Sequence, residues 1–231
     1  PPGGFAKKTA EAESAYDFIV RTVTANPGEV TIVAIGPLTN VAIALGKEPG
    51  LASKIKELVI MGGALASLPD GGGNITPNAE FNFWVDPEAA RKTLRSGVRI
   101  LLSPLNVSRK TKLTKSWYDE MVGSDTAITA LLKDTMGTHF RTEPARPRLM
   151  YDQVAMASLV DRTLVTTQEL YVDVDAHHGI NYGVSVGGEE PWPGAEGAKK
   201  MLVQHDLDWP RFIQMFVARM RAPVRRPAEG G

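Results

Sequence analysis

Three apolar runs of strand length, each closed by a glycine or proline loop, most constrain the fold of this chain. They cover residues 29–35, 54–61 and 98–102, and the first is so nearly continuous that it predicts a strand buried on both faces. Helical patterns at 38–45 and 86–95 separate the runs. This rhythm predicts a mostly parallel sheet with right-handed crossovers, covered by helices on both faces in a Rossmann-like α/β fold.

The second half predicts further helices and a small antiparallel strand element. Residues 171–175 alternate strictly, so Asp173 and Asp175 are expected on the wet face of a strand. His177 and His178 are expected in an exposed loop. The other expected elements are helices at 6–25, 112–122, 126–141 and 208–220, a helix opened by Asp152, and strands at 182–186 and 200–204.

The length of 231 residues, with 43% hydrophobic and 23% charged residues, suits one globular domain. We expect this domain to span residues 1–220 and a disordered tail, rich in Pro, Arg and Gly, to span 221–231. The chain begins with Pro1 rather than Met, so a processed product or a fragment is expected.

The charge balance argues against nucleic-acid and membrane partners. Lys plus Arg and Asp plus Glu both number 26, which leaves no net field to attract nucleic acid or an anionic membrane. No run approaches the roughly 20 apolar residues of a membrane span. Small neutral ligands are more compatible with this charge balance than nucleic acid or a membrane. The absence of cysteine excludes disulfides and a Cys nucleophile but leaves the compartment open.

The stretch 73–87 carries most of the polar chemistry. If it is extended, Glu80 and Asn82 leave one face, while Phe81 and Phe83 leave the other face toward the core. A carboxylate accepts hydrogen bonds and an amide both donates and accepts, so these two residues, with the loop residue Asn74, could bind a vicinal diol. The pattern therefore predicts a sugar site.

Loops at the carboxyl ends of the expected strands should converge on this site, because ligands of parallel sheets bind there. Ile35 and Met61 end two of these strands, although a Met in such a place is more often core filler. Asp86 before Pro87 is expected to be a helix cap. For Asp152, at the start of an apolar helix, capping is likewise the simpler explanation.

Several stretches together resemble the nucleoside hydrolase family, the ribohydrolases of the inosine–uridine type. No single motif would suffice, but the stretches follow the family pattern in order and spacing, and the resemblance extends over nearly all of the ordered chain. They are Val33-Ala34-Ile35-Gly36-Pro37-Leu38-Thr39-Asn40, Val59-Ile60-Met61-Gly62-Gly63, Gly73-Asn74-Ile75-Thr76-Pro77, and Glu80-Phe81-Asn82 through Asp86-Pro87-Glu88-Ala89-Ala90.

The resemblance implies hydrolysis of the N-glycosidic bond of a ribonucleoside to base and ribose by calcium-activated water. It implies that Asp152 contacts calcium and ribose and that the backbone carbonyl of Ile35 is a second calcium ligand. Tyr151 stands where many members place a His thought to protonate the leaving base. A phenol is a weak acid at neutral pH, although a hydrogen-bonded one can still donate. The ribose and pocket contacts that the resemblance implies are Asn74, Glu80, Asn82 and Met61.

The sequence also favours a second hypothesis from another class. The Asp-rich motif that supplies most calcium carboxylates in the family has no counterpart here, and calcium takes roughly 6–8 oxygen ligands. A non-catalytic ribose- or nucleoside-binding remnant of such an enzyme is therefore the alternative. Base preference and oligomeric state stay open, a homo-oligomer included. The family default is cytoplasmic, and export stays open as well.

Overall fold

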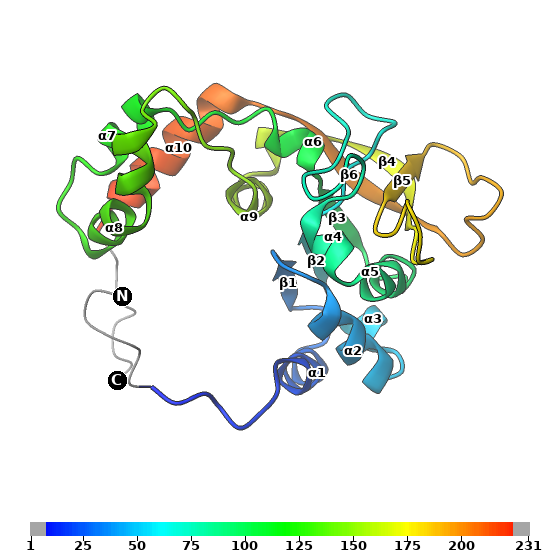
Figure 1. Cartoon of the computed structure of the whole chain (residues 1–231). Helices are drawn as coiled ribbons and strands as arrows, with labels where there is room; N and C mark the ends of the chain where they lie inside the picture. The colour runs from blue at the N-terminus through cyan, green and yellow to red at the C-terminus, as the bar shows by residue number, and fades with distance from the viewer. Residues whose placement is uncertain (1–7, 224–231) are drawn as a thin grey trace.

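Six strands form one sheet in the computed structural model, which describes residues 8–223 (Figure 1). The strands are β1 Thr31–Ala34, β2 Glu57–Met61, β3 Ile100–Ser103, β4 Val165–Val174, β5 Ser185–Gly188 and β6 Lys199–Leu207. Their order is β1-β2-β3-β6-β4-β5. The first four in that order run parallel, whereas β4 pairs antiparallel with both β6 and β5. The predicted fold class is confirmed, including the antiparallel element in the C-terminal half.

Helices connect the strands and cover the sheet. Within residues 8–223 they are α1 Ala15–Ala25, α2 Thr39–Lys47, α3 Leu51–Lys54, α4 Phe81–Val85, α5 Pro87–Leu94, α6 Leu105–Ser108, α7 Lys115–Met121, α8 Ala127–Thr142, α9 Asp152–Val160, the 3-10 helix η1 Arg162–Leu164, and α10 Trp209–Arg221. None of these helices is long and apolar enough to cross a membrane. Asp86 caps α5 as predicted, because its carboxylate accepts a hydrogen bond from Ala89 N at 3.0 Å and Pro87 takes the first helical position.

Alternate residues of the central strands enter two different cores. Leu58 and Ile60 of β2 belong to a cluster that they share with α1, α2, α3 and α5. Val59 and Met61 belong to a second cluster on the other face, where Ala155 of α9 and Leu105 of α6 cover them. Burial on both faces explains why β2 is an uninterrupted apolar run in the sequence.

A third core joins the helices of the second half. Tyr118 of α7 and Phe140 of α8 stack with ring centroids 4.6 Å apart, and Phe212 of α10 is fully buried in the same cluster. Val154 of α9 packs there too, so α9 lies between this cluster and the sheet (Figure 1). The carboxyl ends of β1 and β2 therefore face α9, which the third core holds in place.

Two predictions about the first 35 residues are wrong in detail. Helix α1 begins at Ala15, not at residue 6, because the Ser14 side chain caps it by accepting a hydrogen bond from Asp17 N at 3.2 Å. Strand β1 is not buried on both faces: its residues are half-buried, since it lies at one end of the sheet within the described range. The tail expected at 221–231 falls mostly outside that range, which ends at residue 223.

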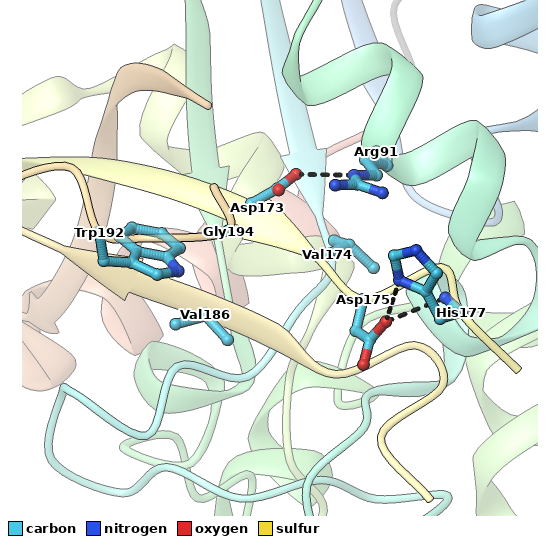
Figure 2. A pocket seen from close by; sticks show the side chains of 8 residues that line it. All are labelled: Arg91, Asp173, Val174, Asp175, His177, Val186, Trp192 and Gly194. Atoms are coloured by element: carbon cyan, nitrogen blue, oxygen red, sulfur yellow. Dashed lines mark hydrogen bonds and ion pairs between the residues drawn. The ribbon is translucent and has the colours of Figure 1, made fainter. Parts of the chain in front are cut away.

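Asp173 does not lie on a wet face, contrary to prediction. It is only 6% exposed, and its carboxylate accepts a hydrogen bond from Arg95 Nε at 3.0 Å. Arg91 Nε lies 3.5 Å from the same carboxylate, as Figure 2 shows. Both arginines belong to the α5 segment, which packs on β4. Asp175 is partly exposed and bonds to the exposed His177, so the two histidines lie in an exposed loop as predicted.

Replacing Asp173 by Asn should destabilise the fold by about 2–4 kcal/mol, because it leaves two partly buried guanidinium groups without their counter-charge. Chemical denaturation of the purified chain measures this free energy of unfolding. Asp175→Asn, just past the end of the same strand, is the matched control and should cost less than about 1 kcal/mol. Equal losses in the two variants would show that the buried ion pair does not hold α5 to the sheet.

Candidate functional site

One pocket of about 300 Å³ brings together all seven residues that the sequence singled out. Phe81 is the eighth residue of its lining. The seven, which come from five separate segments of the chain, are Ile35, Met61, Asn74, Glu80, Asn82, Tyr151 and Asp152. Their convergence at the carboxyl ends of parallel strands agrees with the expected position of a ligand site. Their individual roles stay predictions.

Glu80 is fixed by three backbone N–H groups. Its Oε1 accepts from Asn82 N at 2.9 Å, and its Oε2 accepts from Gly63 N at 2.9 Å and from Phe83 N at 3.1 Å. The predicted extended segment is wrong beyond Glu80, because residues 81–85 form the short helix α4 and Glu80 is its N-cap. The carboxylate, 2% exposed, joins this helix to the loop that follows β2.

The phenylalanines on either side of Asn82 have opposite surroundings. Phe83 is fully buried, as predicted, but Phe81 is 48% exposed, because a helix does not place both on one face. The Phe83 ring fills the space beside Gly62, where a Cβ would lie 2.5 Å from a ring carbon. Gly62 is therefore required for this close approach.

Asn82 is oriented by the end of β2. Its Nδ2 donates to Met61 O at 3.1 Å and lies 3.4 Å from Met61 Sδ. Met61 is buried in the core and also lines the pocket. It therefore fills the core, as expected for a Met at a strand end, and also forms part of the pocket wall. With its N–H used, Asn82 offers its Oδ1, which has no hydrogen-bond partner among residues 8–223.

In Asn74 the side-chain oxygen, rather than the side-chain nitrogen, is already hydrogen-bonded. Its Oδ1 accepts from Phe81 N at 2.9 Å, which leaves the Nδ2 donors for the pocket. Arg109, which the sequence analysis missed, holds the loop before it through hydrogen bonds of 2.6–2.9 Å to the four carbonyl oxygens of residues 70–73. An isolated arginine 36 residues after the loop it holds gives no sequence signal that could have found it.

Asp152 is not a helix cap, contrary to the simpler explanation. Tyr151 occupies the N-cap position of α9, and Asp152 is the first helical residue. Its carboxylate accepts no hydrogen bond from the part of the chain that the structure describes, and it faces the pocket. A negative charge in this first turn is favoured by the helix dipole, which leaves the oxygens available to a ligand.

Burial raises the pKa of both carboxyl groups. For Glu80 the burial effect exceeds the lowering by its three backbone N–H partners, and the nearby Asp152 charge adds to the rise. For Asp152 burial alone raises the pKa. Two carboxyl groups in one pocket favour ligands that donate hydrogen bonds or carry positive charge.

The unused hydrogen-bonding groups are complementary to a pair of hydroxyls. Asn74 Nδ2 can donate, while Asn82 Oδ1 and the Asp152 oxygens can accept. Glu80 has used three of about four acceptor positions. Each hydroxyl of a vicinal diol donates one hydrogen bond and accepts others, so the pocket can satisfy both.

The described residues do not form a complete metal site. Between residues 8 and 223 no three His, Asp or Glu side chains gather as metal ligands. Asp152 and Ile35 both line the pocket, but a carboxylate and one backbone carbonyl fall well short of the roughly 6–8 oxygen ligands that calcium takes. The donor chemistry suits calcium, whereas the number of donors does not.

Trp117 and Tyr118 do not line this pocket. Tyr118 is buried in the helical cluster, and Trp117 packs against it. Both side chains therefore pack between helices.

Fold and site together define an α/β protein with a polar pocket at the carboxyl ends of its parallel strands, and the unused groups of this pocket are complementary to hydroxyls. Residues 3–214 match the family model described as inosine-uridine preferring nucleoside hydrolase, and the chain belongs to this family. The predicted membership is confirmed.

Relatives and solved structures agree with this family. The pyrimidine-specific ribonucleoside hydrolase RihB of Escherichia coli O17:K52:H18 is 34% identical over 213 residues, which cover 90% of this chain and 66% of that protein. The plant nucleoside hydrolase PpNRh1 matches with a TM-score of 0.85 and 28% identity, covering 94% of this chain and 70% of that chain. A purine-preferring ribonucleoside hydrolase from Gardnerella vaginalis matches with a TM-score of 0.81 and 32% identity, covering 94% and 68%. The chain thus spans 66–70% of the length of these proteins.

Glu80→Gln should lower the free energy of unfolding by about 1–3 kcal/mol. An amide has one acceptor oxygen, so its NH₂ group must face at least one buried backbone N–H and leave it unpaired. Thermal and urea unfolding measure the loss. Glu48→Gln, at a partly exposed ion pair with Lys54, is the control and should change stability by less than about 0.5 kcal/mol. A Glu80 variant as stable as the control would contradict the three-bond arrangement.

Asp152→Asn should leave stability unchanged or raise it by less than about 1 kcal/mol at neutral pH. Burial raises the folded-state pKa of Asp152 above its ordinary value of 3.8, so the folded form prefers the protonated acid. Ionisation then removes stability from the native protein as the pH rises from 3.8 through the raised pKa, and this loss is absent in the variant. Urea unfolding of both proteins between about pH 3 and 7 tests the sign. A variant that loses stability as the pH rises relative to the native chain would refute it.

Proposed function

We propose that the protein hydrolyses the N-glycosidic bond of a ribonucleoside and releases free base and ribose. The observation that supports this best is the pocket in which Asn74, Asn82 and Asp152 keep unused hydrogen-bonding groups that match the 2′- and 3′-hydroxyls of ribose. Membership of the nucleoside hydrolase family supports the same reaction.

The reaction needs three events at the sugar. The oxygen of a water molecule bonds to C1′, the C1′–N bond breaks with its electron pair leaving on the base, and the water loses a proton. Asp152 is our candidate for accepting that proton, because burial raises its pKa and an acceptor of higher pKa takes a proton more readily. Tyr151, beside it on the pocket wall, is our candidate for donating a hydrogen bond to the departing base.

Glu80 acts in this proposal mainly as a positioning residue. Its three backbone contacts hold α4 against the loop after β2, and thereby aim Asn82 into the pocket. The fourth acceptor position of the carboxylate remains for a ribose hydroxyl.

Calcium, which the family resemblance implies, would meet Asp152 and the Ile35 carbonyl here. When bound, such an ion supplies a more acidic water. Two oxygens are too few for it, and none of the steps above depends on the ion.

The alternative is a protein that binds ribose or a nucleoside without hydrolysing it. One observation favours it, namely that residues 8–223 contain no cluster of three metal-ligating side chains. Turnover distinguishes the two functions, because the binding protein would hold the same ligands without releasing base.

The protein should discriminate against 2′-deoxyribonucleosides, because the missing hydroxyl leaves buried polar groups unpaired at a cost of about 1–3 kcal/mol, or roughly 5- to 150-fold in kcat/KM. Base release from uridine and from 2′-deoxyuridine measures the ratio. In Asn82→Ala, which removes one of the groups concerned, the ratio should shrink toward unity. Equal efficiency of the native protein on both substrates would remove the assignment to ribonucleosides.

A further inference from the structure

A second pocket, of about 240 Å³, lies where α5 packs beside β4 and its hairpin partner β5 (Figure 2). It shares no lining residue with the pocket around Glu80, and none of its side chains has a role in the proposed hydrolysis. It is called here the Trp192 pocket. The lining residues that determine its chemistry are Arg91, Asp173, Asp175, His177, Val186 and Trp192.

Arg91 supplies unused hydrogen-bond donors to this pocket. The Asp173 carboxylate has both of its oxygens hydrogen-bonded by Arg95, through Nε and Nη2. Arg91 Nε lies 3.5 Å from the same carboxylate and, although buried, has no hydrogen-bond partner within residues 8–223. A guanidinium carries five N–H donors and keeps its positive charge. Arg91 can therefore donate to an anionic group in the pocket.

Asp175 and His177 supply acceptors. Asp175 Oδ1 accepts from His177 N at 2.9 Å and lies 3.1 Å from His177 Nδ1. Because a carboxylate only accepts, Nδ1 carries the proton, and Nε2 of the neutral imidazole is an acceptor. The other carboxylate oxygen, Oδ2, makes no hydrogen bond with the described part of the chain. Both Oδ2 and Nε2 can therefore accept from a positively charged N–H group.

Trp192 forms an apolar wall at the end of the pocket away from Arg91 and Asp175, as Figure 2 shows. Its ring lies over Gly188 of β5, where an added Cβ would be 3.4 Å from Trp192 Cε3. Prolines flank it on both sides and restrict its backbone. Val186, which is 44% exposed, adds apolar surface. The pocket thus combines an apolar wall with groups of opposite charge.

We propose that the Trp192 pocket binds a small zwitterion, namely an α-amino acid with an apolar side chain. The carboxylate of the ligand accepts hydrogen bonds from Arg91. Its ammonium group donates to Asp175 Oδ2 and His177 Nε2, and its side chain lies against the Trp192 ring. A ligand with only one of the two charges would be repelled by the like charge of the lining. This inference does not depend on the proposed hydrolysis.

The test is an NMR titration with L-leucine and with two analogues that each lack one of its charges. 3-Methylbutylamine lacks the carboxylate, and 4-methylpentanoate lacks the ammonium group. The indole N–H resonance of Trp192, assigned by its loss in Trp192→Phe, reports binding. L-Leucine should bind with a Kd of about 1 mM or below. Each analogue should bind at least about tenfold more weakly, because it loses a hydrogen bond to a charged group.

Two variants separate the two charge contacts. Arg91→Met should weaken L-leucine binding about tenfold or more and should not weaken binding of 3-methylbutylamine, which has no carboxylate. Asp175→Asn should weaken L-leucine binding similarly and should not weaken binding of 4-methylpentanoate. Lys92→Met, on the same helix as Arg91 but outside the lining, is the matched control and should bind L-leucine within about threefold of the native chain. The dispersion of each NMR spectrum shows that the variant is folded.

Three results would overturn the assignment. The first is the absence of a saturable shift of the Trp192 resonance with L-leucine up to about 20 mM. The second is an affinity of the native chain for either analogue equal to that for L-leucine. The third is tighter binding of uracil than of L-leucine, unchanged in Arg91→Met and Asp175→Asn, which would assign the pocket to a neutral planar ring.

Discussion

One buried carboxylate determines the arrangement of the site. Glu80 accepts hydrogen bonds from the backbone of Gly63, Asn82 and Phe83, and so links the loop after β2 to the first turn of α4. An ionised group 2% exposed would be costly without such partners. Because Phe83 is also locked in the core, the helix has no freedom to rotate, and Asn82 keeps its direction.

The same carboxylate, together with Asp152, makes the pocket acidic. Burial raises the pKa of Glu80, and the nearby charge of Asp152 raises it further. A neutral diol fits here because its hydroxyls donate to these oxygens, whereas an anionic ligand would be repelled.

The parallel sheet and the position of the site could be predicted, because buried strands leave uninterrupted apolar runs and the polar residues follow their carboxyl ends. The conformation at Glu80 could not be predicted. A five-residue helix is too short to show a helical period in the sequence, and Gly63, which donates to the Glu80 carboxylate, is 17 residues away. The burial of Asp173 was missed for a related reason. Strict alternation predicts a wet face, but here arginines of a preceding helix cover that face.

Arg109 gives the rim of the pocket an unusual dependence on one side chain. The loop that it holds contains three consecutive glycines, which lose more conformational entropy on ordering than any other residue type. The Arg109 guanidinium, which lies outside the loop, orders it by donating hydrogen bonds to four of its carbonyl oxygens. Natural variation at position 109 would change ligand affinity through the entropy of this loop, although the residue itself does not line the pocket.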